Sequence, residues 1–209
     1  MTSISYGKLM EFTPKALPLF REALRCADRV LSCFGIMNSP NRTAHFLAQI
    51  AHESDAFQRN KENLSYSTPE RLRAVWPSRF PTLDSAMPFI HNPKGLALHV
   101  YGNRMDLGNT EPEDGWNFIG RGLIQMTGRG MYSRIGLLLD APFVSNPELV
   151  NTIHYALPAA AEIWRLKGCN RHADVNDLEG ITRRINGGLN GLTSRKVWLD
   201  KMRTVVTDI

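Results

Sequence analysis

The sequence predicts a mainly α fold, and three observations support this prediction. A capping residue precedes proline at Ser39-Pro40, Thr68-Pro69 and Asn92-Pro93. This pair is typical of helix starts, because proline at the first helical position loses no hydrogen bond. Apolar residues recur at helical spacing after these starts. Strand-like alternation of apolar and polar residues is scarce, so we expect at most a small β-hairpin, within residues 103–126.

The length of 209 residues fits a single domain, which we assign to residues 1–209. Hydrophobic residues make up 43% of the chain, enough for a core, and charged residues make up 22%. No run of about 18 apolar residues occurs, so we expect no membrane insertion. The start of the chain lacks a basic segment followed by an apolar stretch and a cleavage site, so we expect no signal peptide.

The expected helices follow in chain order. An N-terminal helix runs over about 13–34 with its apolar stripe in the core, and the rest of the domain occupies about 40–208. The second helix begins at Ser39-Pro40 and ends near Glu53. Further helices are expected at about 68–77, 92–102, 128–139, 147–167 and 177–185. The last helix, at about 193–206, should bury Val197, Trp198, Met202 and Val205.

Two glutamates in unlike settings lie close together in the sequence. Glu53 falls in the last turn of an apolar helix, where the unpaired carbonyl groups disfavour a second negative charge and so favour a protonated acid. Glu62 follows in a polar segment with no apolar period. Hydrolysis of a glycosidic bond needs one protonated and one ionised carboxyl group. The pair is therefore a candidate for such chemistry, but its spacing alone favours the ordinary interpretation, because glutamates at helix ends are more often solvated surface groups.

A glycine-rich segment at 120–128 carries further candidate polar groups. Gln125 and Thr127 are two residues apart, so on an extended segment both side chains point to the same side, where they can bind a sugar or hold a water molecule. Arg121 can either steady a carboxylate or brace the loop, and bracing is slightly favoured. In the acidic loop before this segment, Glu111 or Asp114 can rival Glu62 as the second carboxylate.

Four blocks of the sequence together resemble the family 19 glycoside hydrolases, and more closely the endolysins (phage lysozymes) that share that chitinase-like domain. These blocks are AHFLAQIAHES (44–54), ENLSYS (62–67), GWNFIGRGLIQMTGRGMY (115–132) and INGGLNG (185–191). The resemblance implies a lysozyme-like, two-lobed domain with a substrate cleft. It implies that Glu53 is the general acid, that Glu62 is the general base, and that Thr127 helps to hold the attacking water. The residues that we expect to bind substrate are Gln125, Asn186, Tyr66 and Arg121, although Asn186 and Gly187 can also simply form a helix C-cap.

The same resemblance implies the substrate and the setting. The endolysin substrate is peptidoglycan, cut between N-acetylmuramic acid and N-acetylglucosamine. The family inverts configuration, which requires carboxyl groups about 6.5–9.5 Å apart. As an endolysin, the protein is expected to be a monomer that stays in the host bacterial cytoplasm until a holin releases it to the cell wall.

The sequence departs from the family pattern at two places. Asp55-Ala56 stands where small residues such as Gly-Gly usually follow the glutamate helix, and Met131 stands where an asparagine commonly precedes the tyrosine. The second change removes one sugar contact of the chitinases and weakens a chitin assignment. A chitinase using the same residues remains the alternative enzyme, and an inactive wall-binding protein remains the alternative from another class.

The net charge of +5 and the sequence pI of about 9.3 attract polyanions in general. No dense basic run or nucleic-acid motif occurs, so we expect no nucleic-acid partner. An anionic wall polymer fits the charge equally well, and a basic surface with no specific partner is the other interpretation. The three cysteines argue against a disulfide framework. His45 and His52 are seven residues apart without a surrounding ligand set, so we expect no metal and no cofactor.

Overall fold

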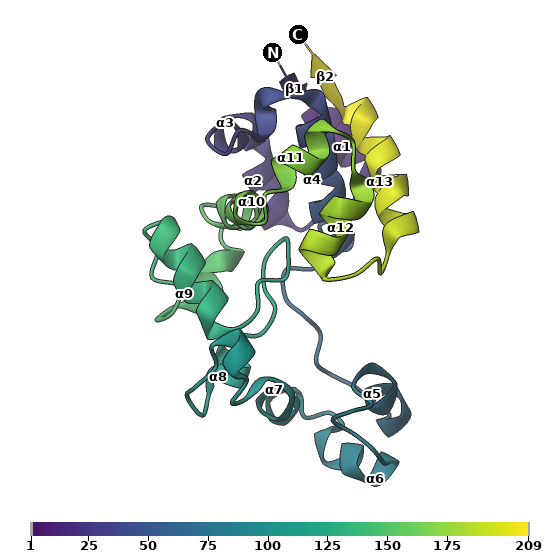
Figure 1. Ribbon diagram of the computed structural model, residues 1–209, viewed down its shortest axis with the longest axis vertical. Helices are drawn as coiled ribbons and strands as arrows, with labels where there is room; N and C mark the ends of the chain where they lie inside the picture. The colour runs from purple at the N-terminus through teal and green to yellow at the C-terminus, as the bar shows by residue number, and fades with distance from the viewer. Residues whose placement is uncertain (1, 209) are drawn as a thin grey trace. The chain divides into compact units, whose positions relative to one another are not determined.

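The computed structural model describes residues 2–208, which form two compact units. The first unit contains residues 2–60, 121–125 and 135–208, and the second contains Lys61–Gly120 and Met126–Arg134. Helices dominate both units (Figure 1), so the predicted mainly α fold class is confirmed. None of the helices within residues 2–208 combines the length and apolar character that crossing a bilayer requires.

Helix α4 (Pro40–Glu53) lies in the core of the first unit. Its start is the predicted one, because the Ser39 side chain accepts a hydrogen bond from the Arg42 N–H at 3.2 Å and Pro40 takes the first position. Every residue from Thr43 to Ala51 is buried, as expected of a helix surrounded by others. Helix α4 packs against α13 (Leu192–Val205), although the two helices are far apart in the sequence.

The other helices of the first unit surround this pair. They are α1 (Tyr6–Phe12), α2 (Pro18–Arg25), α3 (Ala27–Ser32), α10 (Ala156–Leu166), α11 (Cys169–Asp174) and α12 (Leu178–Asn186), with the 3-10 helices η1 (Ile36–Asn38) and η4 (Pro147–Asn151). The single helix predicted over 13–34 is wrong, because the chain forms α2 and α3 there. Proline inside a helix removes a backbone hydrogen bond, so α2 begins at Pro18. Cys26 then separates the end of α2 from the start of α3.

The two strands of the described chain are also not where we expected them. β1 (Thr2–Ile4) pairs antiparallel with β2 (Val206–Asp208), in the register Ile4 with Val206, so the two ends of the chain lie side by side (Figure 1). Residues 103–126 instead form turns with η3 (Met105–Leu107) and α8 (Asp114–Asn117), and Arg121 and Met126 are single β-bridge residues rather than strands. The predicted hairpin position is therefore wrong, since pairing between residues so far apart in sequence leaves no local signal.

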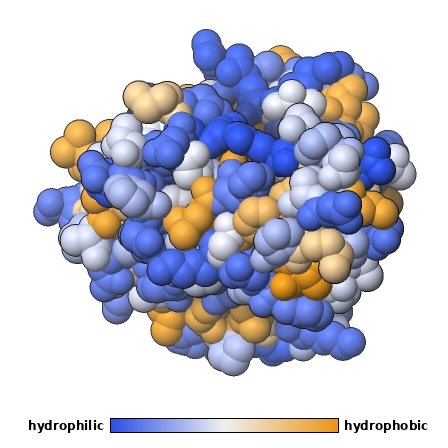
Figure 2. Space-filling view, turned by 90° about the horizontal axis from the view of Figure 1, so that it is seen from below, coloured by the Kyte–Doolittle hydropathy of each residue, from blue (hydrophilic) through white to orange (hydrophobic). Residues whose placement is uncertain are grey.

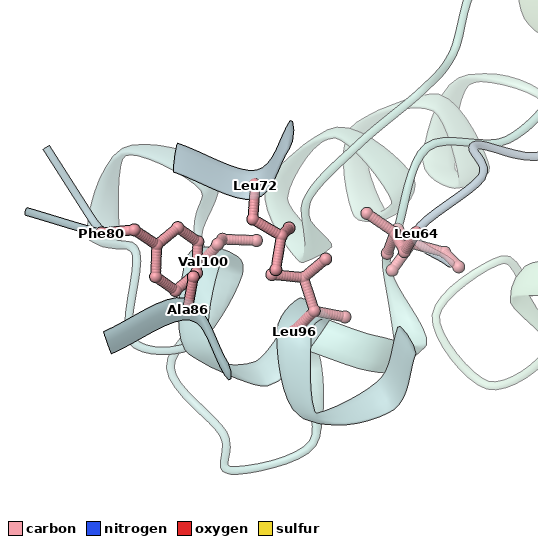
Figure 3. Close-up of a cluster of buried hydrophobic side chains, with 8 residues drawn as sticks. Leu64, Leu72, Phe80, Ala86, Leu96 and Val100 are labelled. Carbon is pink, nitrogen blue, oxygen red and sulfur yellow. The ribbon is translucent and has the colours of Figure 1, made fainter. Parts of the chain in front are cut away.

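The second unit is built around its own apolar cluster, shown in Figure 3. Its helices are α5 (Pro69–Val75), α6 (Leu83–Ala86), η2 (Met87–Phe89), α7 (Pro93–Tyr101), η3, α8 and the first part of α9 (Arg129–Leu138). Leu64, Leu72, Phe80, Ala86, Leu96 and Val100 belong to the cluster, and Tyr66 and Tyr101 pack against it half-buried. The cluster thus places two tyrosines next to the segment that carries Glu62.

Side chains on the face seen in Figure 2 are mostly hydrophilic, with hydrophobic ones in small groups between them. Such scattered apolar groups are ordinary for a protein surface.

Candidate active site

The first unit holds Glu53 by an arginine from the last helix. Arg195 on α13 donates from Nη2 to Glu53 Oε1 and from Nη1 to Gln49 Oε1, one turn earlier on α4. The Arg195 side chain is 1% exposed and that of Glu53 is 17% exposed. Within residues 2–208, Oε2 of Glu53 has no hydrogen-bond partner. One oxygen of this carboxyl group is therefore fixed, and the other is available to carry a proton.

Arg195 is a buried partner of Glu53 that the expectation from the helix end alone did not include. Sequence analysis missed Arg195, although a signal was present. The buried residues of α13 are Arg195, Leu199, Met202 and Val205, which follow helical spacing with the arginine at the first position. Val197, which was expected to face inward, is 51% exposed.

A left-handed turn follows Glu53 directly. Asp55, Ala56 and Phe57 have φ values of 53°, 56° and 63°. The turn is held by Ser54, which accepts from the Phe57 N–H at 3.0 Å, and by the Ala56 N–H, which donates to the Ala51 carbonyl at 2.7 Å. Glycine adopts this conformation without a steric cost, while other residues pay about 1 kcal/mol or more each. This turn explains why glycines suit the position at which this chain has Asp55-Ala56.

Replacing Ala56 by glycine should therefore stabilise the protein by about 1 kcal/mol, because it removes Cβ strain that exceeds the added freedom of the unfolded chain. Urea unfolding would show a higher midpoint with an unchanged slope. Ala74→Gly, on the exposed face of α5, is the control, and it should lower the free energy of unfolding by about 1 kcal/mol. A lower midpoint for Ala56→Gly would contradict the strain argument.

The second unit holds Glu62 by both of its oxygens. Oε1 accepts a hydrogen bond from the Gly120 N–H at 2.5 Å, and Oε2 accepts one from the Tyr101 hydroxyl at 2.8 Å. The Glu62 N–H donates to the Gly120 carbonyl at 2.9 Å, which fixes the backbone as well. Donors thus hold both oxygens of Glu62, whereas Oε2 of Glu53 has no hydrogen-bond partner within residues 2–208.

Two tyrosines accompany Glu62. Burial, and then the charge of Glu62, raise the pKa of the Tyr101 hydroxyl far above its ordinary value, so Tyr101 remains a donor at any physiological pH. Burial is also the largest cause that raises the pKa of Tyr66, with Arg71 opposing and Glu62 adding to the shift. The Tyr66 ring packs edge-on against Trp76, with centroids 5.5 Å apart. The structure thus brings Tyr66 to Glu62 and adds Tyr101, which sequence analysis did not select.

Tyr101→Phe should lower kcat/KM by about 10–100-fold. The change removes one hydrogen bond to a charged group, worth about 1.5–3 kcal/mol, and keeps the ring in the apolar cluster. Initial rates of glycan hydrolysis measure it. Tyr155→Phe is the matched control, because its ring packs on Phe143 and its hydroxyl has no partner within residues 2–208. Equal losses in both variants would show that the Tyr101 hydrogen bond is unimportant.

The two rival carboxylates occupy different settings. Asp114 has no exposed side-chain surface, and Arg129 contacts both of its oxygens at 2.8 and 2.6 Å. Burial alone would raise the pKa of Asp114, but Arg129 and the N–H groups of Glu111 and Thr110 outweigh it and hold the pKa below its usual range. Glu111 is exposed. Asp114 therefore has the environment of a structural ion pair rather than that of a base that reaches a water molecule.

Asp114→Asn should destabilise the protein by about 3 kcal/mol at neutral pH, because it leaves Arg129, only 32% exposed, without its countercharge. The folded-state pKa of Asp114 is lowered, so its contribution is present above the unfolded value of about 3.9 and is lost as pH falls through the folded value. Urea unfolding of both proteins between about pH 7 and pH 2 should show the difference shrinking in acid. A constant difference would contradict this account.

The remaining predicted site residues lie as follows. Arg121 is buried and donates to Glu148 Oε1 from Nε at 2.9 Å and from Nη2 at 2.8 Å, which supports the bracing role. Gln125 has a φ of 50°, so the segment is not extended there and the same-side argument for Gln125 and Thr127 is wrong. Asn186 ends α12 exposed, and the following Gly187, with a φ of 79°, forms the C-cap.

Thr127 is half-buried and lines a cavity of about 270 Å³ in the second unit, together with Leu107, Met131 and Arg134. A larger cavity, of about 620 Å³, lies beside α3 and β1 and is lined by neither glutamate. The smaller cavity is thus the one of these two that a predicted site residue lines. Across residues 2–208 no three His, Cys, Asp or Glu side chains are grouped in a way that could hold a metal ion.

Comparison with known proteins adds the family. No family model matches the sequence. A "Glycosyl hydrolase family 19 domain-containing protein" of Haemophilus influenzae is 37% identical over 195 residues, which cover 93% of this chain and 92% of that protein. Chitinase C from Streptomyces griseus shares the fold with a TM-score of 0.66 at 18% identity, covering 97% of this chain and 76% of that one. The crystal structure of a bacterial family 19 chitinase gives the same TM-score and identity, over 97% of this chain and 94% of that one.

The helical fold and these relatives define a glycoside hydrolase. The chain belongs to glycosyl hydrolase family 19.

Proposed function

We propose that this glycosidase hydrolyses the β-1,4 bond between N-acetylmuramic acid and N-acetylglucosamine in peptidoglycan, with inversion of configuration. Glu53 acts as the general acid and Glu62 as the general base. The observation that carries the proposal is the difference between the two carboxyl groups. Glu62 accepts hydrogen bonds on both oxygens, whereas Glu53 Oε2 has no partner within residues 2–208.

The mechanism follows from that difference. A proton on Glu53 Oε2 is transferred to the leaving glycosidic oxygen, while Arg195 keeps Oε1 in place. Glu62, held in place by Tyr101 and Gly120, takes a proton from the water that attacks the anomeric carbon. Each carboxylate oxygen has a second lone pair, so the existing hydrogen bonds leave room for this proton. Thr127 is proposed to help orient the water.

Two observations favour peptidoglycan over chitin as the proposed substrate. The net charge of +5 suits an anionic wall polymer, and Met131 replaces the asparagine that contacts sugar in the resembled chitinases. Chitin is the second candidate, because the solved structures that share this fold are chitinases. We further propose an endolysin role, in which the monomer stays in the host cytoplasm until a holin releases it to the wall. Induced cells should then lyse only when a holin is expressed with it.

Mass spectrometry of borohydride-reduced digestion products tests the proposal. Purified peptidoglycan and N-acetylglucosamine hexamer are digested in parallel. A reduced muramic acid end supports a muramidase, whereas a reduced glucosamine end means that the neighbouring bond is cut. Release of stem peptide without new reducing ends would overturn the bond class. Faster turnover of the hexamer than of peptidoglycan would establish the chitinase alternative.

A further inference from the structure

The cavity beside Thr127 is lined by an arginine that makes no hydrogen bond or ion pair within residues 2–208. Arg134 on α9 lines this cavity and is exposed. Because Arg134 keeps all of its donors for solvent, it can bind an anionic group that enters the cavity.

The acidic residue of the cavity does not neutralise Arg134. Asp106 also lines it, but both oxygens of Asp106 accept hydrogen bonds from Arg104, from Nε at 2.8 Å and from Nη2. These bonds lower the pKa of Asp106, and the charge of Arg79 contributes to the same shift. Arg104 neutralises Asp106, so the charge of Arg134 leaves the cavity with a net positive charge.

The rest of the lining consists of two apolar side chains and two glycines, Gly108 and Gly130, in closely packed backbone. Leu107 and Met131 provide apolar surface. A Cβ on Gly128 would lie 2.6 Å from the Leu107 carbonyl oxygen, and one on Gly108 would lie 2.9 Å from the Gly130 nitrogen. Both glycines have positive φ values, 87° and 70°, which other residues adopt at a cost. This close backbone packing keeps the two segments together and the cavity in shape.

We propose that this cavity is a subsite for a carboxylate carried by the muramic acid residue of the glycan. Arg134 binds the carboxylate, and Leu107 and Met131 contact the apolar part of the same substituent. Thr127 links the subsite to the reacting sugar. The inference rests on the proposed function, and it deepens it by naming the group that separates peptidoglycan from chitin, which carries no carboxylate. The carboxylate belongs either to the lactyl group of a glycan without peptides or to the stem peptide.

Arg134→Gln tests the inference against Arg73→Gln, which removes the same charge from an exposed position on α5 outside the cavity. Three substrates are compared: peptidoglycan with stem peptides, the same glycan after the peptides are removed, and N-acetylglucosamine hexamer. We expect Arg134→Gln to raise KM about tenfold on at least one muramic acid substrate with kcat nearly unchanged, since it loses a charge-assisted hydrogen bond. Turnover of the hexamer and all rates of Arg73→Gln should not change.

The pattern of losses identifies the source. A loss on intact peptidoglycan alone assigns the stem peptide, and a loss on the stripped glycan alone assigns the lactyl group. An equal loss on the hexamer, or no loss on any substrate, would overturn the subsite. Binding of the muramic acid oligomers to Glu53→Gln protein, with and without Arg134→Gln, gives a readout that is independent of turnover. If the wild type binds these oligomers through Arg134 but cuts no peptidoglycan, the proposed function fails while the subsite stands.

Discussion

Glu53→Gln should lower kcat for peptidoglycan hydrolysis by about 10²–10⁴-fold, the usual contribution of a general acid. Glutamine has the shape of glutamate and can still accept the Arg195 hydrogen bond, but it has no proton to give to the leaving oxygen. Binding of the glycan should therefore change little. Initial rates by reducing-end assay and binding to purified walls measure the two effects separately.

Two controls make this result specific to Glu53. Glu70→Gln removes an exposed glutamate from the first turn of α5 and should leave the rate unchanged. Urea unfolding of Glu53→Gln checks that the buried Arg195 tolerates a neutral partner. Equal lysis by wild type and variant would remove Glu53 from the mechanism. Wall binding without any hydrolysis by the wild type would instead establish the inactive wall-binding alternative.

Glu62→Gln should produce a loss of similar size, about 10²–10⁴-fold in kcat, because a neutral amide cannot take a proton from the attacking water. Glutamine is also a poor replacement at this position, since its NH₂ group would face either the Tyr101 hydroxyl or the Gly120 N–H, both of which donate to the carboxylate. The same reducing-end assay measures the loss.

Glu111→Gln is the matched control, because Glu111 is the exposed rival carboxylate, and its replacement should change the rate by less than about twofold. If Glu111→Gln lost most of its activity while Glu62→Gln stayed active, Glu111 rather than Glu62 would be the general base. NMR of fresh product supplies an independent check. An inverting enzyme with a water-activating base releases the α-anomer first, so an initial β-anomer would contradict the role of Glu62.

Local signals in the sequence were sufficient for most of the fold. The side chains of Ser39, Thr68 and Asn92 accept hydrogen bonds from the N–H groups three residues on, and Pro40, Pro69 and Pro93 begin the helices as predicted. Such signals work because a helix start is decided by a few neighbouring residues. The same logic failed for the helix expected over about 13–34, because Pro18 is a second possible helix start and α2 begins there.

The sequence by itself determined the helical class, the family blocks and the two glutamates with unlike surroundings. Only the tertiary structure decided which groups hold those glutamates. Arg195 reaches Glu53 across 142 residues of sequence and Tyr101 reaches Glu62 across 39, and β1 meets β2 from the opposite end of the chain. Helix signals arise from residues within a turn or two, whereas such pairings depend on how whole helices pack, which short-range patterns do not encode.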